Sequence, residues 1–147
     1  EHAMTIICWD GKTLAADKRM GFGSEFATVT KIHRVGGNLV GWAGDSALGK
    51  AMIAWAKTGF VAADFPAGQR DRVNNGSLMV ITNDGEIYHY GVEPYPMVIE
   101  DATYTIGSGS PFAMAAMHLG CSASRAVEVA CALNMNSGNG IDTLELA

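Results

Sequence analysis

Short apolar runs separated by glycine-containing turns dominate the pattern of hydrophobic and polar positions along this chain. Two such runs joined by a tight turn are typical of a β-hairpin, most clearly where the turn is Asp-Gly. The pattern predicts three hairpins, formed by residues 6–9 with 13–16, 30–35 with 39–43, and 77–82 with 86–90. It also predicts further strands at residues 97–99, 103–106 and 141–146.

Three other stretches have the spacing of helices with one apolar face, at residues 47–57, 112–119 and 126–133. We expect Asp45 or Ser46 to cap the first helix, because both side chains accept hydrogen bonds from free N–H groups. Ser110 is expected to cap the second, with Pro111 in its first turn. Ser122 or Ser124 begins the third.

Two segments lack a clear period. Residues 20–30 are rich in glycine and are interpreted as an irregular loop near the mouth of any site. Residues 60–75 are polar and mixed, with at most a short helical piece at 69–73. Strands in antiparallel hairpins with helices grouped outside them indicate an α+β protein built in layers.

Composition narrows the classes of function. The chain has 147 residues, 48% hydrophobic and 17% charged, with a net charge of −5. We expect one domain at residues 4–147, preceded by residues 1–3 as a remnant before a native Met4. No run of basic residues suits nucleic acid, and no apolar run approaches the length of a membrane span. The three cysteines fit no zinc pattern and are expected to be buried, reduced thiols. We also expect neither a metal nor a cofactor.

The strongest chemical candidate is Thr5, which follows Met4. If everything before Thr5 is removed, this residue carries both a hydroxyl and a free α-amine. An α-amine titrates near pH ~7.7–8.0 and therefore acts as a base at neutral pH. A threonine beside its own amine is a known form of activated nucleophile. The alternative is an ordinary edge-strand threonine behind a start methionine.

Three more residues could complete such a site. Asp17 follows an apolar run directly, where a carboxylate can hold a cation inside the fold. Lys31 is either a solvated strand residue or a buried ammonium that lowers the pKa of the Thr5 amine. Gly44 precedes a helix and is either a simple turn residue or a backbone N–H donor to an oxyanion.

The motifs taken together resemble the proteasome β-subunit and bacterial HslV peptidase family. The resemblance covers nearly all of residues 4–147 and rests on Thr5 and on five motifs in order: AADKR, TKIHRV, GWAGDSALG, TIGSGSPFA and SGNGID. It implies a four-layer α-β-β-α sandwich of two antiparallel sheets, the fold of the N-terminal nucleophile hydrolases.

The resemblance also implies a role for each matching residue. Thr5 is the nucleophile and its amine the base, Asp17 and Lys31 are the buried pair beside it, and Gly44 is the oxyanion glycine. Ser108 and Ser137 match serines that bind around the terminal amine. The substrate-binding candidates are Arg19, Met20, Gly21 and Trp42.

Four departures from the family pattern bear on activity. Thr5 is not terminal in this sequence, so we expect the form that retains residues 1–4 to be inactive. Ile6 stands where a second threonine is common, and Asn134 stands where proteasome-type chains carry an acidic residue. Residues 60–75 are too short for the usual full second helix, which contributes to ring contacts.

Three functions follow from these observations. The first is a threonine peptidase in a self-compartmentalised homo-oligomer, in the cytoplasm, acting on peptides or unfolded proteins with a separate ATPase as partner. The second is a catalytically inactive, proteasome-like structural or binding protein. The third is a small-molecule amidase of the same superfamily.

Overall fold

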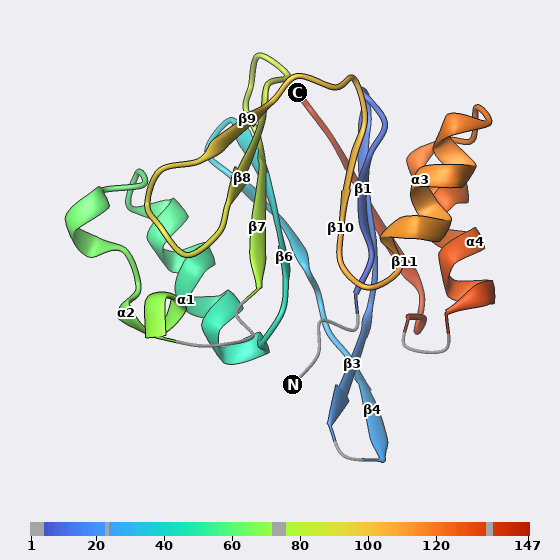
Figure 1. Ribbon diagram of the computed structural model, residues 1–147, viewed down its shortest axis with the longest axis horizontal. Coiled ribbons are helices and arrows are strands. Elements are labelled where there is room, and N and C mark those ends of the chain that lie inside the picture. The colour runs from blue at the N-terminus through green and yellow to red at the C-terminus, as the bar shows by residue number, and fades with distance from the viewer. Residues whose placement is uncertain (1–4, 23, 72–75, 135–136) are drawn as a thin grey trace.

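The computed structural model describes residues 5–22, 24–71, 76–134 and 137–147. Figure 1 shows two β-sheets packed face to face, with α1 and α2 outside one sheet and α3 and α4 outside the other. This is the four-layer α-β-β-α arrangement expected from the sequence. No helix of the described residues is both long and apolar enough to cross a bilayer.

The larger sheet has five antiparallel strands in the order β5-β6-β7-β8-β9. Its strands are β5 (Ile32–Val35), β6 (Asn38–Ala43), β7 (Ser77–Ile81), β8 (Ile87–Tyr90) and β9 (Met97–Ile99). The smaller sheet has the order β10-β1-β2-β11. Its strands are β1 (Ile7–Trp9), β2 (Thr13–Asp17), β10 (Tyr104–Ile106) and β11 (Ile141–Glu145). The three predicted hairpins are therefore present, with ends that differ by one or two residues.

Three of the helices are preceded by an N-cap residue that is either glycine or a residue with a short polar side chain. The helices are α1 (Ser46–Lys57), α2 (Ala67–Asp71), α3 (Ser110–His118) and α4 (Ala123–Leu133). Asp45 and Ser122 cap α1 and α4 by accepting hydrogen bonds from backbone N–H groups. The prediction for α3 was wrong: Gly109 is the capping residue and Ser110 is already helical. A Cβ at Gly109 would lie 3.0 Å from the Ile6 Cβ, so this capping position has little room for a side chain.

One of the two predictions for the irregular segments was wrong. Residues 20–30 are not a loop, because β3 (Arg19–Phe22) and β4 (Glu25–Thr28) form an antiparallel ribbon that projects from the body in Figure 1. The Arg19 guanidinium lies 4.4 Å from the centre of the Phe26 ring on the opposite strand. Residues 60–75 contain a 3₁₀ turn (Ala62–Asp64) before α2, and the end of the predicted helix at 69–73 lies outside the described residues.

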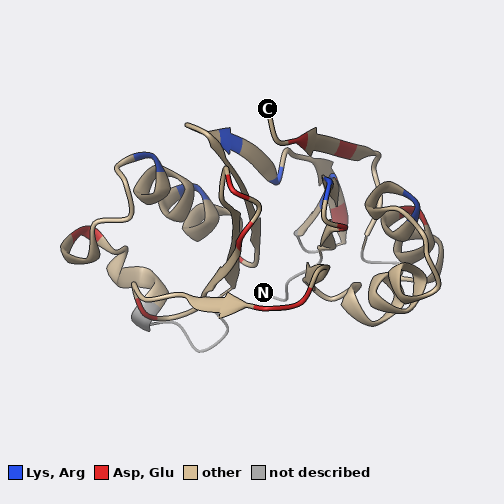
Figure 2. Ribbon diagram, turned by 90° about the horizontal axis from the view of Figure 1, so that it is seen from above, with Lys and Arg blue, Asp and Glu red and all other residues tan. Residues whose placement is uncertain are grey.

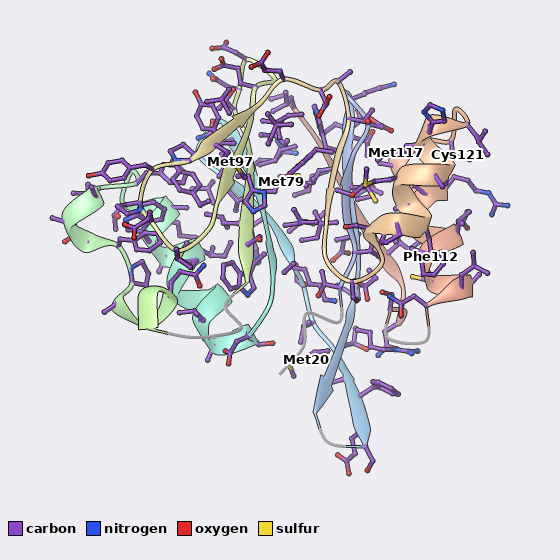
Figure 3. All side chains as sticks on the ribbon, in the orientation of Figure 1. Met20, Met79, Met97, Phe112, Met117 and Cys121 are labelled. Carbon is purple, nitrogen blue, oxygen red and sulfur yellow. The ribbon has the colours of Figure 1, made fainter. Side chains whose placement is uncertain are left out.

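Strand alternation divides the core between the layers. On β6, Leu39 packs between the two sheets, whereas its neighbour Val40 packs against α1. Met79 lies between the sheets and Met117 lies between the smaller sheet and the C-terminal helices, as Figure 3 shows. This period of two residues is what allows one strand to bury both faces.

A polar bridge crosses the space between the sheets. The imidazole of His89 on β8 contacts the Tyr104 hydroxyl on β10 through Nδ1, and the Ser77 hydroxyl on β7 through Nε2 at 2.9 Å. Burial lowers the pKa of His89 below its ordinary value of 6.5. The bridge is therefore built around a neutral imidazole.

Gly49 allows us to test the packing of α1 on the larger sheet. A Cβ at this position would lie 2.1 Å from Cδ1 of the buried Trp42 ring. Alanine normally stabilises a helix interior by about 1 kcal/mol relative to glycine. We expect Gly49→Ala instead to destabilise the protein by about 1–3 kcal/mol in urea unfolding, because the indole must move. Gly68→Ala in α2 is the control, since its Cβ meets only an ordinary contact at 3.4 Å.

The His89 bridge predicts a pH dependence of stability. The unfolded chain binds a proton at His89 more readily than the folded chain does. Stability should therefore be lost as the pH falls from about 6.5 through the lower folded pKa. Between about pH 7.5 and pH 5.5, the free energy of unfolding should fall more for the native chain than for His89→Gln. Equal losses in the two proteins would contradict this assignment.

Candidate active site

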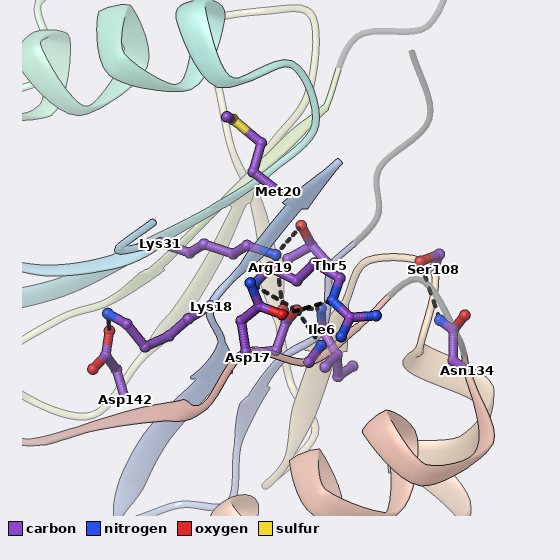
Figure 4. A network of polar contacts seen from close by, with 12 residues as sticks. Thr5, Ile6, Asp17, Lys18, Arg19, Met20, Lys31, Ser108, Asn134 and Asp142 are labelled. Atoms are coloured by element: carbon purple, nitrogen blue, oxygen red, sulfur yellow. Dashed lines mark hydrogen bonds and ion pairs between the residues drawn. The ribbon is translucent and has the colours of Figure 1, made fainter. Parts of the chain in front are cut away.

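Asp17, at the end of β2, is the centre of the polar network drawn in Figure 4. Its side chain is fully buried, and its two carboxylate oxygens accept four hydrogen bonds. Oδ1 accepts from the Ile6 N–H at 3.1 Å and from Lys31 Nζ at 2.8 Å. Oδ2 accepts from the Arg19 N–H at 3.2 Å and the Gly138 N–H at 3.0 Å. This set of donors satisfies a buried charge that would otherwise be costly.

Lys31 joins Asp17 to Thr5. Its ammonium donates to Thr5 Oγ1 at 2.9 Å as well as to Asp17, and the residue is 8% exposed. Burial lowers the pKa of Lys31 below 10.5, and the charge of Asp17 opposes this effect. A cation that donates to the Thr5 hydroxyl stabilises negative charge on that oxygen. Lys31 is thus a buried ion-pair partner and not a solvated strand residue.

The backbone of Thr5 is held on both sides. Its carbonyl oxygen accepts from the Gly109 N–H at 3.2 Å, and the next N–H, of Ile6, binds Asp17. Gly107, which has a φ of +106°, approaches so closely that a Cβ there would lie 2.1 Å from the Thr5 carbonyl oxygen. The Thr5 hydroxyl is therefore fixed by its main chain as well as by Lys31.

Gly44 lies at the junction of β6 and α1, beside the same site. Its φ of +145° is one that side chains rarely adopt, and a Cβ would lie 2.6 Å from the Gly76 Cα. Two chain segments can therefore meet here only because both residues are glycine. Gly44 also lines the cavity beside Thr5, so its backbone stays a candidate donor to an oxyanion.

A cavity of about 620 Å³ opens beside Thr5. All four predicted substrate-binding residues line it, together with Thr5, Lys31 and Gly44. Those four are Arg19, Met20, Gly21 and Trp42. The Ser46 hydroxyl donates to Met20 Sδ at 2.8 Å, which connects β3 to the start of α1. The Trp42 indole N–H donates to the Asp45 carbonyl at 2.8 Å.

The two predicted serines lie outside this cavity. Ser108 is exposed, and its hydroxyl accepts from Asn134 Nδ2 at 3.3 Å, apart from the Lys31 cluster in Figure 4. Ser137 is 2% exposed, and its Oγ has no hydrogen-bond partner among the described residues. Neither serine bonds to Thr5 within the part of the chain that the structure describes. The backbone next to Ser137 does reach the site, through the Gly138 N–H on Asp17.

One wall of the cavity was not predicted. It is the face of α1 that carries Ser46, Lys50, Ile53 and Lys57, opposed by His33 on β5. Burial and the nearby charge of Lys57 lower the pKa of His33 below 6.5. The spacing of those four helix positions places them on one face, and this is the signal that could have identified them.

Substitution of Lys31 tests whether the ion pair organises this region. We expect Lys31→Met to destabilise the protein by about 3–5 kcal/mol, because the buried Asp17 carboxylate loses its cation. Chemical unfolding measures the effect. Lys12→Met, at an exposed lysine in the β1–β2 turn, is the control and should change stability by less than about 0.5 kcal/mol. Equal effects of the two substitutions would show that Asp17 does not depend on Lys31.

Comparison with solved structures identifies the fold. No sequence-family profile and no curated protein matches the chain. Thiobacillus denitrificans BPH in complex with epoxomicin is 18% identical with a TM-score of 0.72, over 97% of this chain and 99% of that one. Eukaryotic HslV from Trypanosoma brucei is 20% identical with a TM-score of 0.63, over 96% and 98%.

A mutant of Anbu from Hyphomicrobium sp. strain MC1 is 12% identical with a TM-score of 0.73, over 96% of this chain and 81% of that one. These proteins are proteasome-like N-terminal nucleophile hydrolases. The similarity extends over 96–97% of this chain in all three comparisons. The chain has the proteasome-like, HslV-like N-terminal nucleophile hydrolase fold.

Proposed function

We propose that this protein is a threonine-type peptidase whose nucleophile is Thr5, active once residues 1–4 have been removed. The observation that carries the proposal is the hydrogen bonding of Lys31 Nζ to both Thr5 Oγ1 (2.9 Å) and Asp17 Oδ1 (2.8 Å) beside the cavity. The Thr5 hydroxyl, the buried Lys31 ammonium and a cavity that can hold a substrate lie together at this site. These are the parts that amide hydrolysis requires.

The α-amine supplies the base. While Met4 precedes Thr5, the Thr5 nitrogen is part of a peptide bond and cannot take up a proton. After removal of Met4 it becomes an amine, and the positive charge of Lys31 lowers the pKa of that amine and favours its free-base form. In this proposal the base is therefore the chain terminus itself.

The reaction proceeds through an acyl-enzyme. Thr5 Oγ attacks the carbonyl carbon of the scissile amide while the α-amine takes the hydroxyl proton. The Gly44 N–H stabilises the oxyanion of the tetrahedral intermediate. The ammonium returns its proton to the leaving amine as the C–N bond breaks, which leaves an ester on Thr5. Water, deprotonated by the same amine, hydrolyses this ester and releases the carboxylic acid.

The proposal includes a single catalytic domain at residues 4–147 and assembly into a homo-oligomer. Exposed apolar side chains support the assembly, since Met114 and Leu119 at α3 are 59% and 84% exposed and Met97 on β9 is 58% exposed. Large exposed apolar side chains of this kind are candidates for contacts between copies of the chain. Peptides or unfolded proteins as substrates, a separate ATPase and a cytoplasmic location are parts of the same proposal, taken from the family resemblance.

The decisive experiment exposes Thr5 and asks whether it reacts. The chain is produced with a cleavable ubiquitin-like partner directly before Thr5, which is removed to leave Thr5 first. Epoxomicin, which is bound in the BPH structure, is the probe, and intact mass spectrometry is the readout. We expect one adduct on the chain that begins at Thr5. The chain that retains residues 1–4 and the Thr5→Ala chain should remain unlabelled.

Turnover of fluorogenic peptides by the same preparation measures the activity itself. Hydrolysis that disappears in Thr5→Ala supports the peptidase. Labelling with turnover of small amides only would point to the amidase. A folded chain that begins at Thr5 and neither labels nor hydrolyses any amide would overturn the proposal in favour of a non-catalytic protein.

A further inference from the structure

The cavity beside Thr5 has more basic than acidic side chains in its walls, although the protein as a whole is acidic. The chain as a whole has a net charge of −5, with 15 acidic and 10 basic residues. The cavity is nevertheless lined by four basic side chains, Arg19, Lys31, Lys50 and Lys57. Asp45 is the one acidic side chain among its described lining residues. A cavity wall with an excess of one sign of charge attracts ligands of the opposite sign.

Three of these charged groups already have partners within the protein. Lys31 binds Asp17 and Thr5, and Arg19 Nε donates to Asn139 Oδ1 at 2.9 Å. The Asp45 carboxylate accepts from the Leu48 N–H at the start of α1. The positive end of the helix therefore offsets much of the single negative charge in the cavity. The charges of these groups are therefore partly satisfied by contacts within the protein.

Lys50 and Lys57 are different. Neither forms an ion pair with any residue in the described segments. Both are exposed and lie on the cavity face of α1, which carries two basic residues and no acidic one (Figure 2). Seven residues of helix separate them by about 10 Å along the axis. Lysine has a flexible stem of four carbons, so one carboxylate lying between them can be approached by both.

The remaining walls suit the rest of an acidic side chain. Trp42 and Ile53 provide apolar surface for its methylene groups. His33 faces α1 from β5 and is close enough to Lys57 to be affected by its charge. An imidazole N–H at this position is a further donor for a carboxylate. A basic side chain would instead meet repulsion from both lysines.

We propose that the cavity selects substrates with an acidic side chain next to the scissile bond, and that Lys50 and Lys57 determine this specificity. The inference rests on the proposed function, because it identifies the substrate class of the same site. It assigns a role to two surface lysines that take no part in the chemistry at Thr5.

The test compares glutamate with glutamine, which has nearly the same shape but no charge. One measurement is the hydrolysis of acetyl-Ala-Ala-Glu-aminomethylcoumarin and of its Gln counterpart by the chain that begins at Thr5. The other is the binding of acetyl-Ala-Ala-Glu-amide and its Gln counterpart to the Thr5→Ala chain by calorimetry. We expect a preference for Glu on the order of fivefold to tenfold in both, weakened by added salt.

Charge reversal assigns the preference to particular residues. The double variant Lys50→Glu/Lys57→Glu should lose the preference for Glu and favour Gln. Lys12→Glu makes the same type of change at an exposed lysine that does not line the cavity, and it should keep the preference. Circular dichroism checks that each variant is folded, and single variants at position 50 or 57 replace the double one if it is not.

Failure of the inference and failure of the proposed function give different results. Equal treatment of Glu and Gln, or a preference that survives reversal at both lysines, overturns the inference while leaving the peptidase intact. Absence of turnover overturns the peptidase. Preferential binding of Glu to the Thr5→Ala chain still supports the acidic ligand class in that case.

Discussion

The buried carboxylate of Asp17 is the constraint on which the rest of the site depends. A charge with no exposure to water needs donors from several directions, and here they come from four separate parts of the chain. Meeting this requirement brings together the start of β1, the start of β3, the residue before β5 and the segment before β11. The arrangement that satisfies Asp17 is thus the same one that places Lys31 at Thr5.

The second constraint on the site is the close approach of backbone segments around it, which requires glycine at several positions. Gly107 lies against the Thr5 carbonyl. Gly76 lies so close to Ala43 that a Cβ added at Gly76 would be 1.9 Å from the Ala43 carbonyl oxygen. Side chains at these positions would force the segments apart. Glycine at these positions therefore allows the chain segments around the site to approach one another closely.

The parts of this fold that the sequence predicted are those governed by local signals. Turn residues such as Asp10-Gly11 and the spacing of Leu48 and Met52 mark hairpins and helices before any tertiary contact forms. The β3–β4 ribbon was missed because its strands have no alternation of apolar and polar residues. Contacts such as that of Arg19 with Phe26 stabilise it, and these appear only once the strands have paired.

The sequence likewise predicted some residues of the candidate site and missed others. Thr5, Asp17 and Lys31 were identified because their motifs resemble a known order, and the structure brings these three into contact. Ser108 and Ser137 matched their motifs equally well but form no hydrogen bond with Thr5 in the described part of the chain. The wall formed by α1 was missed because the helix was interpreted by its buried face alone.

The pairing of β11 with β2 also has a consequence for biosynthesis. Ile141 lies opposite Asp17 in this pair, and the Gly138 N–H just before β11 completes the shell of that carboxylate. A ribosome makes β2 first and β11 more than a hundred residues later, since their paired positions are 124 residues apart (141 − 17). A nascent chain therefore lacks the Gly138 donor to Asp17 until the segment that leads into β11 has emerged. Any activity that depends on the environment of Asp17 can appear only after β11 has been made.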